Sequence, residues 1–203
     1  EIDERYGSKI GLANNYMNIG RVSVNLGKYQ DSLDKFKKSL QLYRDIGSEF
    51  GIASAYYEIG GVYSLQGQIG RALKNLKKSL EIRRRGGAPA SVLEALKSIG
   101  ILYFRLNKYP LAIQNLSQAV DIAEKLRKTA TGNARRDYLI QLIPIYKLLV
   151  KAHLGNGEFS KSFSLMEQAR SRLLLDKLLN KDSDINFPSL EEAMPVMYNE
   201  LLE

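Results

Sequence analysis

The stretch that decides the fold is Tyr-Tyr-Glu-Ile-Gly-Gly-Val-Tyr at residues 56–63, because its pattern returns along the chain. Forty residues earlier the sequence has Tyr-Met-Asn-Ile-Gly at residues 16–20, and forty residues later it has Leu-Lys-Ser-Ile-Gly-Ile-Leu-Tyr at residues 96–103. A weaker fourth copy, Tyr-Lys-Leu-Leu-Val-Lys-Ala-His at residues 146–153, follows after a further fifty residues. Four copies in register indicate an internal structural repeat.

A turn and a second apolar segment follow each copy. The turns are Leu-Gly-Lys-Tyr at 26–29, Gln-Gly-Gln-Ile at 66–69, Leu-Asn-Lys-Tyr at 106–109 and Asn-Gly-Glu-Phe at 156–159. Glycine and asparagine tolerate the left-handed backbone angles that such turns need. Beyond each turn a small residue precedes a large apolar one by four positions, in the pairs Ser32–Phe36, Ala72–Leu76, Ala112–Leu116 and Ser162–Met166. Apolar residues recur at steps of three and four on both sides of the turn, which predicts a pair of amphipathic helices per copy.

Glycine stands inside the first helix of three of these pairs, at Gly20, Gly60 and Gly100. Glycine costs a helix about 1 kcal/mol relative to alanine, so we interpret these positions as places where the second helix approaches closely. The matching small residues on the second helices are Ser32, Ala72 and Ala112. A hairpin of this kind cannot bury its apolar face alone and must stack on its neighbours. The expected fold class is therefore all-α, a solenoid of helical hairpins.

The pattern resembles the tetratricopeptide repeat (TPR), which has an aromatic residue, Leu-Gly and Tyr on one helix and Ala and Phe on the next. The resemblance covers roughly residues 12–180 and implies a right-handed superhelical solenoid. The period of 40 residues exceeds the usual 34, as in subfamilies with longer second helices. In the fourth copy Val150 replaces the glycine and Pro144 interrupts the leading helix, so we expect a more splayed or kinked hairpin.

The expected hairpins are residues 12–51, 52–91, 92–137 and 138–180, with a loop at 129–133. Residues 1–11 are expected to be the remnant helix end of a preceding repeat, because residues 6–13 match residues 46–53 at an offset of 40. A linker at 181–188 and a short C-terminal helix at 189–203, opened by the capping box Ser-Leu-Glu-Glu, are expected next. We therefore expect a fragment of a larger solenoid protein.

A second resemblance concerns the end of the repeats. Residues 169–176, Ala-Arg-Ser-Arg-Leu-Leu-Leu-Asp, are similar to the stretch that closes the array in TPR proteins with a CHAT-type, caspase-like protease domain. This resemblance implies that the chain is the sensor or docking arm of a protease. The protease domain, with its His-Cys pair, would then lie beyond residue 203 and would be a partner within the same parent chain.

The composition excludes several function classes. The chain of 203 residues is 44% hydrophobic and 26% charged, as expected for an ordinary domain or a short array of repeats. It contains no cysteine and a single histidine, His153, which excludes thiolate zinc sites, cysteine nucleophiles and multi-histidine metal sites. His153 takes the position of Tyr63 and Tyr103 in earlier copies, so we interpret it as a packing residue. We expect a cytoplasmic, non-enzymatic protein with no catalytic residue, metal or cofactor.

In TPR arrays the first helices of successive hairpins line a concave groove, and the resemblance places candidate binding residues there. In the first hairpin these are Asn14, Asn18, Arg21 and Asn25, whose spacing of four, three and four puts them on one helix face. Asparagine is a poor helix former, but its amide can hold a peptide backbone, and peptide-binding TPR proteins use asparagines in this way. The groove positions in the other hairpins are Tyr57, Glu58 and Ser64; Lys97, Phe104 and Arg105; and Lys147 and Lys151.

These positions predict recognition of another protein or a peptide segment. The asparagines would hold the peptide backbone, Tyr57 and Phe104 would be the anchors, and the lysine-rich end would select acidic groups. The carboxylate-clamp pattern of chaperone-binding TPR proteins is not reproduced. The alternative interpretation of the groove is a merely solvated polar face.

The charge is unevenly distributed. Lys and Arg number 30 against 22 Asp and Glu, for a net charge of +8, and residues 181–203 hold six acids and one Lys. Residues 1–180 therefore carry +13, which favours an acidic partner. The densest basic run is expected on the convex face, where it supports a nucleic-acid-associated scaffold as an alternative function, with no membrane partner. That run consists of Arg71, Lys74, Lys77, Lys78 and Arg83–Arg85.

Overall fold

The structure, a computed structural model, describes residues 2–179. The side chains of residues 2–7, 132, 133, 136, 139 and 172–179 are not part of the description. The expected linker at 181–188 and helix at 189–203 lie outside the described residues. No helix within residues 2–179 is both long and apolar enough to cross a membrane.

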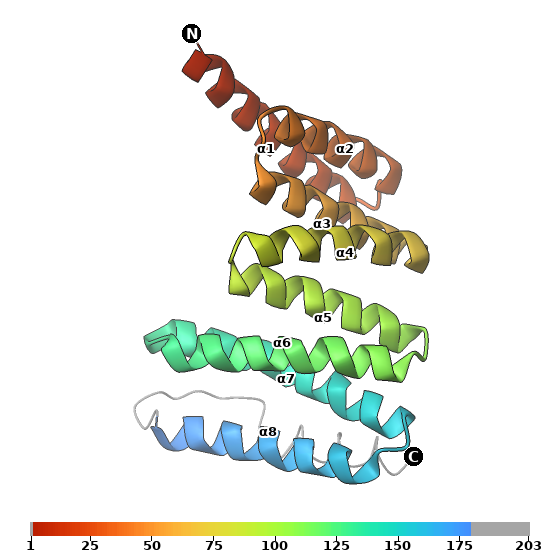
Figure 1. The fold of residues 1–203 in the computed structure, drawn as a ribbon, viewed down its shortest axis with the longest axis vertical. Coiled ribbons are helices and arrows are strands. Elements are labelled where there is room, and N and C mark those ends of the chain that lie inside the picture. Colours follow the sequence, from red (N-terminus) through yellow and green to blue (C-terminus); the bar gives the residue numbers. More distant parts are fainter. Residues whose placement is uncertain (1, 180–203) are drawn as a thin grey trace.

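The described residues form eight helices that pair into four hairpins, and the hairpins stack in one direction (Figure 1). The helices are α1 (Ile2–Asn25), α2 (Tyr29–Asp45), α3 (Glu49–Leu65), α4 (Ile69–Arg85), α5 (Pro89–Arg105), α6 (Tyr109–Thr129), α7 (Gly132–Gly155) and α8 (Phe159–Leu179). The two helices of each hairpin contact one another, and each second helix also packs on the first helix of the next hairpin. The predicted all-α repeat solenoid is confirmed.

Some hairpin limits differ from those expected from the sequence. Residues 2–11 are not a separate helix end, because α1 continues through them without a break. Helix growth is cooperative and ends only where a residue leaves helical geometry, as Gly47 does after α2 with a φ of 68°. The connection between α6 and α7 consists only of Ala130 and Thr131, so the expected boundary after residue 137 falls inside α7. That helix also continues through Pro144.

The turns within the hairpins adopt the backbone conformation that the sequence predicts. Gly27, Gly67 and Gly157 have φ values of 71°, 73° and 76°, and Asn107 has a φ of 54°. Asn107 is the only non-glycine residue with a positive φ within the described part of the chain. Asparagine is one of the few residues that accept this geometry, so it substitutes for glycine in the third hairpin.

The glycines inside the first helices lie directly against the second helices. A Cβ atom added to Gly20 would lie 2.5 Å from the ring of Phe36, and one added to Gly60 would lie 2.8 Å from Leu76. At Gly100 the added atom would lie 2.7 Å from Leu116. The predicted close approach is therefore confirmed. The space left by each glycine is filled by the large residue of the second helix.

Buried serines add a second link inside two hairpins. Ser39 donates a hydrogen bond to the carbonyl oxygen of Ala13 at 2.8 Å, and Ser79 donates to that of Ala53 at 2.7 Å. Both serines are fully buried and bond across 26 residues of sequence. The third hairpin has Ala119 at this position, so its helices are held by apolar contact there.

We expect the neighbouring substitutions Gly60→Ala and Gly61→Ala to have opposite effects on stability. Gly60→Ala places a methyl group against Leu76 and should lower the free energy of unfolding by about 1–3 kcal/mol. Nothing lies within 4 Å of a Cβ atom at Gly61, so Gly61→Ala should raise it by up to about 1 kcal/mol through helix propensity. Urea unfolding followed by circular dichroism measures both, and equal effects would contradict the packing role of Gly60.

Candidate binding groove

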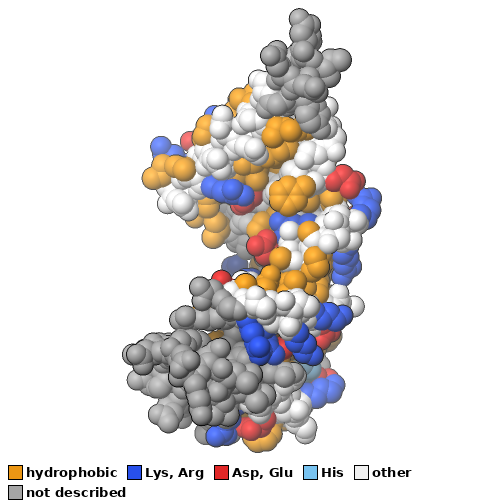
Figure 2. Space-filling view, turned by 90° about the vertical axis from the view of Figure 1, so that its left-hand side faces the viewer, with side chains coloured by type: hydrophobic (Ala, Val, Ile, Leu, Met, Phe, Trp, Pro, Cys, Tyr) orange, Lys and Arg blue, Asp and Glu red, His pale blue; other side chains and the backbone are white. Residues whose placement is uncertain are grey.

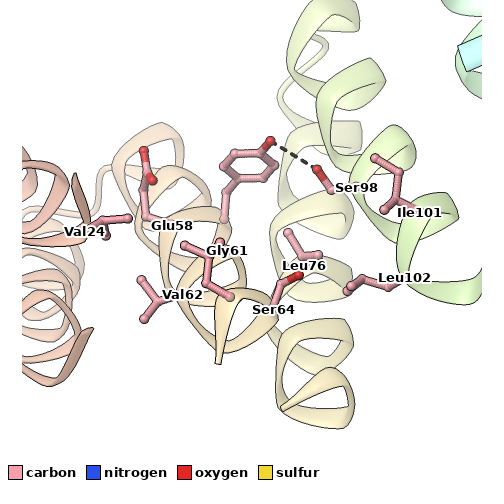
Figure 3. Close-up of a pocket in the computed structure, with 11 residues that line it drawn as sticks. Val24, Glu58, Gly61, Val62, Ser64, Leu76, Ser98, Ile101 and Leu102 are labelled. Carbon is pink, nitrogen blue, oxygen red and sulfur yellow. Dashed lines mark hydrogen bonds between the residues drawn. The ribbon is translucent and has the colours of Figure 1, made fainter. Parts of the chain in front are cut away.

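A hollow of about 330 Å³ opens on the face formed by the first helices α1, α3 and α5 (Figure 3). Its floor is apolar, and polar groups from α3 and α5 stand at its rim. Ser64 and Glu58 come from α3, and Ser98 comes from α5. The apolar and small residues that line it are Val24, Gly61, Val62, Leu65, Leu76, Ile101 and Leu102.

Tyr57 is held in place at the wall of this hollow. Its hydroxyl shares a hydrogen bond of 3.1 Å with the hydroxyl of Ser98, drawn as the dashed line in Figure 3. The guanidinium of Arg83 lies 4.5 Å from the centre of its ring, which is cation–π geometry. The sequence predicts Tyr57 as an anchor for a ligand, and the structure places it among the residues that line the hollow.

Arg83 does not lie on the convex face, where the sequence places it together with Arg84 and Arg85. Its side chain is buried, and it donates to the carbonyl oxygen of Ser91 at 2.6 Å and to Glu94 at 3.2 Å. The prediction for this residue is wrong because it occupies the position of Tyr43 in the first hairpin, which also points between helices. A buried cation needs such partners to offset its desolvation.

Arg21 and Glu58 come together across the rim of the hollow. Arg21 of α1 donates to Glu58 of α3 at 2.7 Å, with exposed side-chain fractions of 53% and 24%. An exposed pair of this kind adds at most about 1 kcal/mol to stability. Its main consequence here is that the charges of Arg21 and Glu58 neutralise one another at this end of the predicted groove.

The predicted row of asparagines divides into two parts. Asn14 accepts a hydrogen bond of 2.5 Å from the hydroxyl of Tyr43 and thus holds α1 against α2. Asn18 and Asn25 are exposed and form no hydrogen bond with the described residues. Two of the three amides therefore remain available to a ligand, and they stand on α1, the helix that contributes Val24 to the hollow.

The basic end of the predicted groove lies on α5 and α7. Arg105 donates to the hydroxyl of Ser64 at 3.5 Å and so reaches the rim of the hollow from α5. Lys97, Lys147 and Lys151 are half-buried. None of these lysines lines the hollow. Phe104 does not line it either, because its ring packs edge to face on Tyr109 with 5.8 Å between ring centres.

The groove positions predicted from the sequence omit Leu65, Ser98 and Ile101, which the structure places in the hollow. The repeat period contains the signal that finds them. Leu65 follows Asn25 by 40 residues, and Ser98 and Ile101 correspond in the same way to Glu58 and Gly61. When each groove position is followed through the hairpins at the offset of 40 residues, apolar residues are included and the floor of the hollow is found as well.

The comparison with known proteins agrees with this architecture. The tetratricopeptide repeat profile matches residues 11–85 and again residues 51–125, which together cover more than half of the chain. The chain belongs to the tetratricopeptide repeat family. No curated protein matches this TPR chain in sequence.

Several solved structures share the TPR architecture at low sequence identity. BtubC (BKLC) from P. vanneervenii has a TM-score of 0.71 at 16% identity over 81% of this chain and 65% of its own. Aspartyl phosphate phosphatase F from Bacillus subtilis has 0.71 at 14% identity over 96% of this chain and 50% of its own. The apo form of RapI has 0.70 at 18% identity over 87% of this chain. This chain spans only 44% of RapI, and similarity at these identities shows the fold alone.

The proposed link to a CHAT-type protease stays a prediction. The profile match ends at residue 125, well before residues 169–176, which carry that resemblance. The side chains of residues 172–179 also lie outside the description. Among the side chains that the structure describes, no three acidic or histidine groups gather in a way that could hold a metal ion.

His153 is a packed residue of the fourth TPR hairpin. It is buried, and its Nδ1 lies 2.5 Å from Oε2 of Glu158 in the turn between α7 and α8. Lys161 donates to the other carboxylate oxygen of Glu158 at 3.0 Å. The hydrogen bonds from Lys161, first, and His153 lower the pKa of Glu158 below its ordinary value of 4.5.

The lowered pKa of Glu158 predicts a pH-dependent contribution to stability. A carboxylate whose pKa is lower in the folded state stabilises the fold above its unfolded pKa and loses this effect as pH falls. Glu158→Gln should therefore lower the Tm at pH 7, and its difference from wild type should shrink below pH 4.5.

Thermal unfolding followed by circular dichroism at pH 7 and at about pH 3 measures this difference. Glu167→Gln is the matched control, since Glu167 forms an exposed pair with Arg170 at 3.8 Å on the next helical turns of α8. A difference that stays constant with pH would show that Glu158 acts through packing.

Proposed function

We propose that this TPR chain is a non-enzymatic recognition module that binds an extended segment of another protein across α1, α3 and α5. The observation that carries the proposal is the hollow of about 330 Å³ with its apolar floor and polar rim. Its volume falls at the small end of the range for ligand pockets, about 300–1,000 Å³. TPR arrays are protein-binding scaffolds, so the family supports the same conclusion.

The hollow would receive one apolar side chain of the ligand. Leu65 and Ile101 are 59% and 38% exposed, which leaves apolar surface at its mouth for a ligand to cover. Tyr57 is fixed by Ser98 and Arg83, so it offers a rigid aromatic wall that loses little side-chain entropy on binding. Buried aromatic and aliphatic contacts of this kind supply most of the affinity at a protein interface.

Asn18 and Asn25 would hold the backbone of the same ligand. They are seven residues apart, so they stand about 10.5 Å apart along the axis of α1. This distance corresponds to about three residues of an extended peptide, so the ligand would run along α1 between the two amides before it crosses to α3. Each amide offers both a donor and an acceptor, which suits a backbone and does not depend on the ligand's side chains.

The ligand would continue toward α5 and α7, where the basic groove positions lie. Arg105 extends from α5 to Ser64 at the rim, and Lys97 stands on the same helix. Lys147 and Lys151 follow on α7. We therefore propose that acidic residues of the ligand lie on the α7 side of its apolar anchor. The Arg21–Glu58 pair leaves the α1 side without net charge.

We expect removal of the two free amides to weaken peptide binding. A random library of displayed 12-residue peptides is selected on the full chain, and enriched peptides are labelled for fluorescence anisotropy. Asn18→Ala with Asn25→Ala should raise Kd by about tenfold or more, because two hydrogen bonds of about 1 kcal/mol each are lost. Ile101→Glu should raise it further by placing a charge in the apolar hollow.

Asn15→Ala is the matched control, since Asn15 is exposed on the same helix outside the predicted groove row. It should leave Kd unchanged. Enriched peptides that bind all of these variants as tightly as the wild type would show that the groove is not the binding site.

A further inference from the structure

Helix α4 concentrates the positive charge of the molecule. Seven of its 17 residues are Lys or Arg and only Glu81 is acidic, which gives the helix a net charge of +6. None of the other seven helices in the described part of the chain exceeds +3 by sequence. Figure 2 shows Lys and Arg side chains gathered along one edge of the molecule at mid-height.

Most of this charge has no carboxylate partner. The buried Arg83 is neutralised by the exposed Glu94 at 3.2 Å, and Arg85 has only a loose pair with Glu49 at 3.9 Å. The remaining five cations of α4 form no ion pair with the described residues. A cluster of uncompensated cations on one surface creates a positive potential that attracts anionic groups.

Part of the cluster surrounds a hollow of about 600 Å³ between α4 and α6. Lys77, Arg84 and Arg85 line it from α4, and Arg84 is oriented by donating to Gln118 of α6 at 2.8 Å. Leu111 lies in its wall with 39% of its surface exposed. The hollow thus combines a cationic rim with accessible apolar surface. None of the residues that line it lines the hollow at α1, α3 and α5.

The side chains of this surface suit a polypeptide better than a nucleic acid. Bases stack on free aromatic faces, but the tyrosine rings beside α4 are already covered by its own cations. Arg71 lies 5.6 Å from the centre of Tyr63, and Lys77 lies 5.5 Å from that of Tyr103. Leu111 and Leu80 line the hollow as well, and their apolar surface suits an aliphatic side chain of a polypeptide better than a phosphate backbone.

We propose that the hollow between α4 and α6 is a second binding surface and that its partner is an acidic protein segment with an apolar side chain. The apolar side chain contacts Leu111, and the acidic groups meet Lys77, Arg84 and Arg85. The side-chain amides of Gln114, Asn115 and Gln118 on α6 form hydrogen bonds with the backbone of the segment. Occupation of this surface leaves the groove open, so the two surfaces bind different segments.

The experiment uses the same library of 12-residue peptides. Peptides that bind an Arg84→Gln/Arg85→Gln variant are first removed, and the remaining peptides are then selected on the full wild-type chain. Depletion removes peptides that bind elsewhere, including those held by the groove. The retained peptides should be rich in Asp and Glu around a Leu, Ile or Phe. Their Kd should rise about fivefold or more in the depleting variant and should also rise with NaCl concentration.

Three variants test whether the retained peptides bind between α4 and α6 through charge. Glu81→Gln should lower Kd two- to threefold, because it removes the one carboxylate that opposes an acidic ligand. Arg84→Lys with Arg85→Lys should retain most of the binding, since it conserves the charge. Asn18→Ala with Asn25→Ala, which tests the groove, should have no effect. Circular dichroism confirms that each variant remains helical.

Two results would overturn the proposal. The first is retained peptides without acidic residues, or with a Kd that Glu81→Gln leaves unchanged or raises. The second is a labelled DNA duplex of 20 base pairs that binds more tightly than the peptides and loses binding in the Arg84→Gln/Arg85→Gln variant. That result would assign the surface to nucleic acid. Neither result affects the proposal for the groove.

Discussion

The contact between a helical glycine and a large apolar residue of the following helix determines the spacing inside the first three hairpins. At Gly20, Gly60 and Gly100 there is no room for a Cβ atom, because Phe36, Leu76 and Leu116 occupy that space. The three large side chains are almost completely buried. Close helix packing buries apolar surface and lets the serine hydroxyls of two hairpins reach a facing carbonyl. The regular stack and its aligned first helices depend on this spacing.

Because the hairpins stack regularly, the period of the sequence places equivalent residues side by side along the proposed binding groove. Residues 40 positions apart occupy equivalent places on α1, α3 and α5, so the groove is built from a few repeated positions with changing side chains. Amides on α1 give way to the apolar hollow at α3 and then to cations on α5 and α7. This change in side-chain character arises because different residues occupy equivalent positions in successive hairpins, while the backbone remains similar.

Cations of the second helices have a structural role, because they lie over tyrosine rings of the first helices. Lys78 and Arg44 both lie over the ring of Tyr56, at 5.1 and 5.7 Å, and Arg83 passes between helices to reach Tyr57. A ring held between basic side chains of successive hairpins links those hairpins without a carboxylate. Many of these cations therefore remain electrically uncompensated, and the convex layer carries the excess charge of the chain.

The sequence by itself determined the all-α hairpin architecture, the glycine contacts and the turn residues, because each depends on local periodicity or on backbone angles that few residues adopt. The TPR resemblance placed the predicted groove on the first helices. Only the tertiary structure decided which groove residues are free. Asn14 bonds Tyr43, Arg21 pairs with Glu58, and Arg83 is buried although its neighbours are exposed. Such pairings join residues 11 to 37 positions apart, and their geometry depends on how helices pack, which no local pattern specifies.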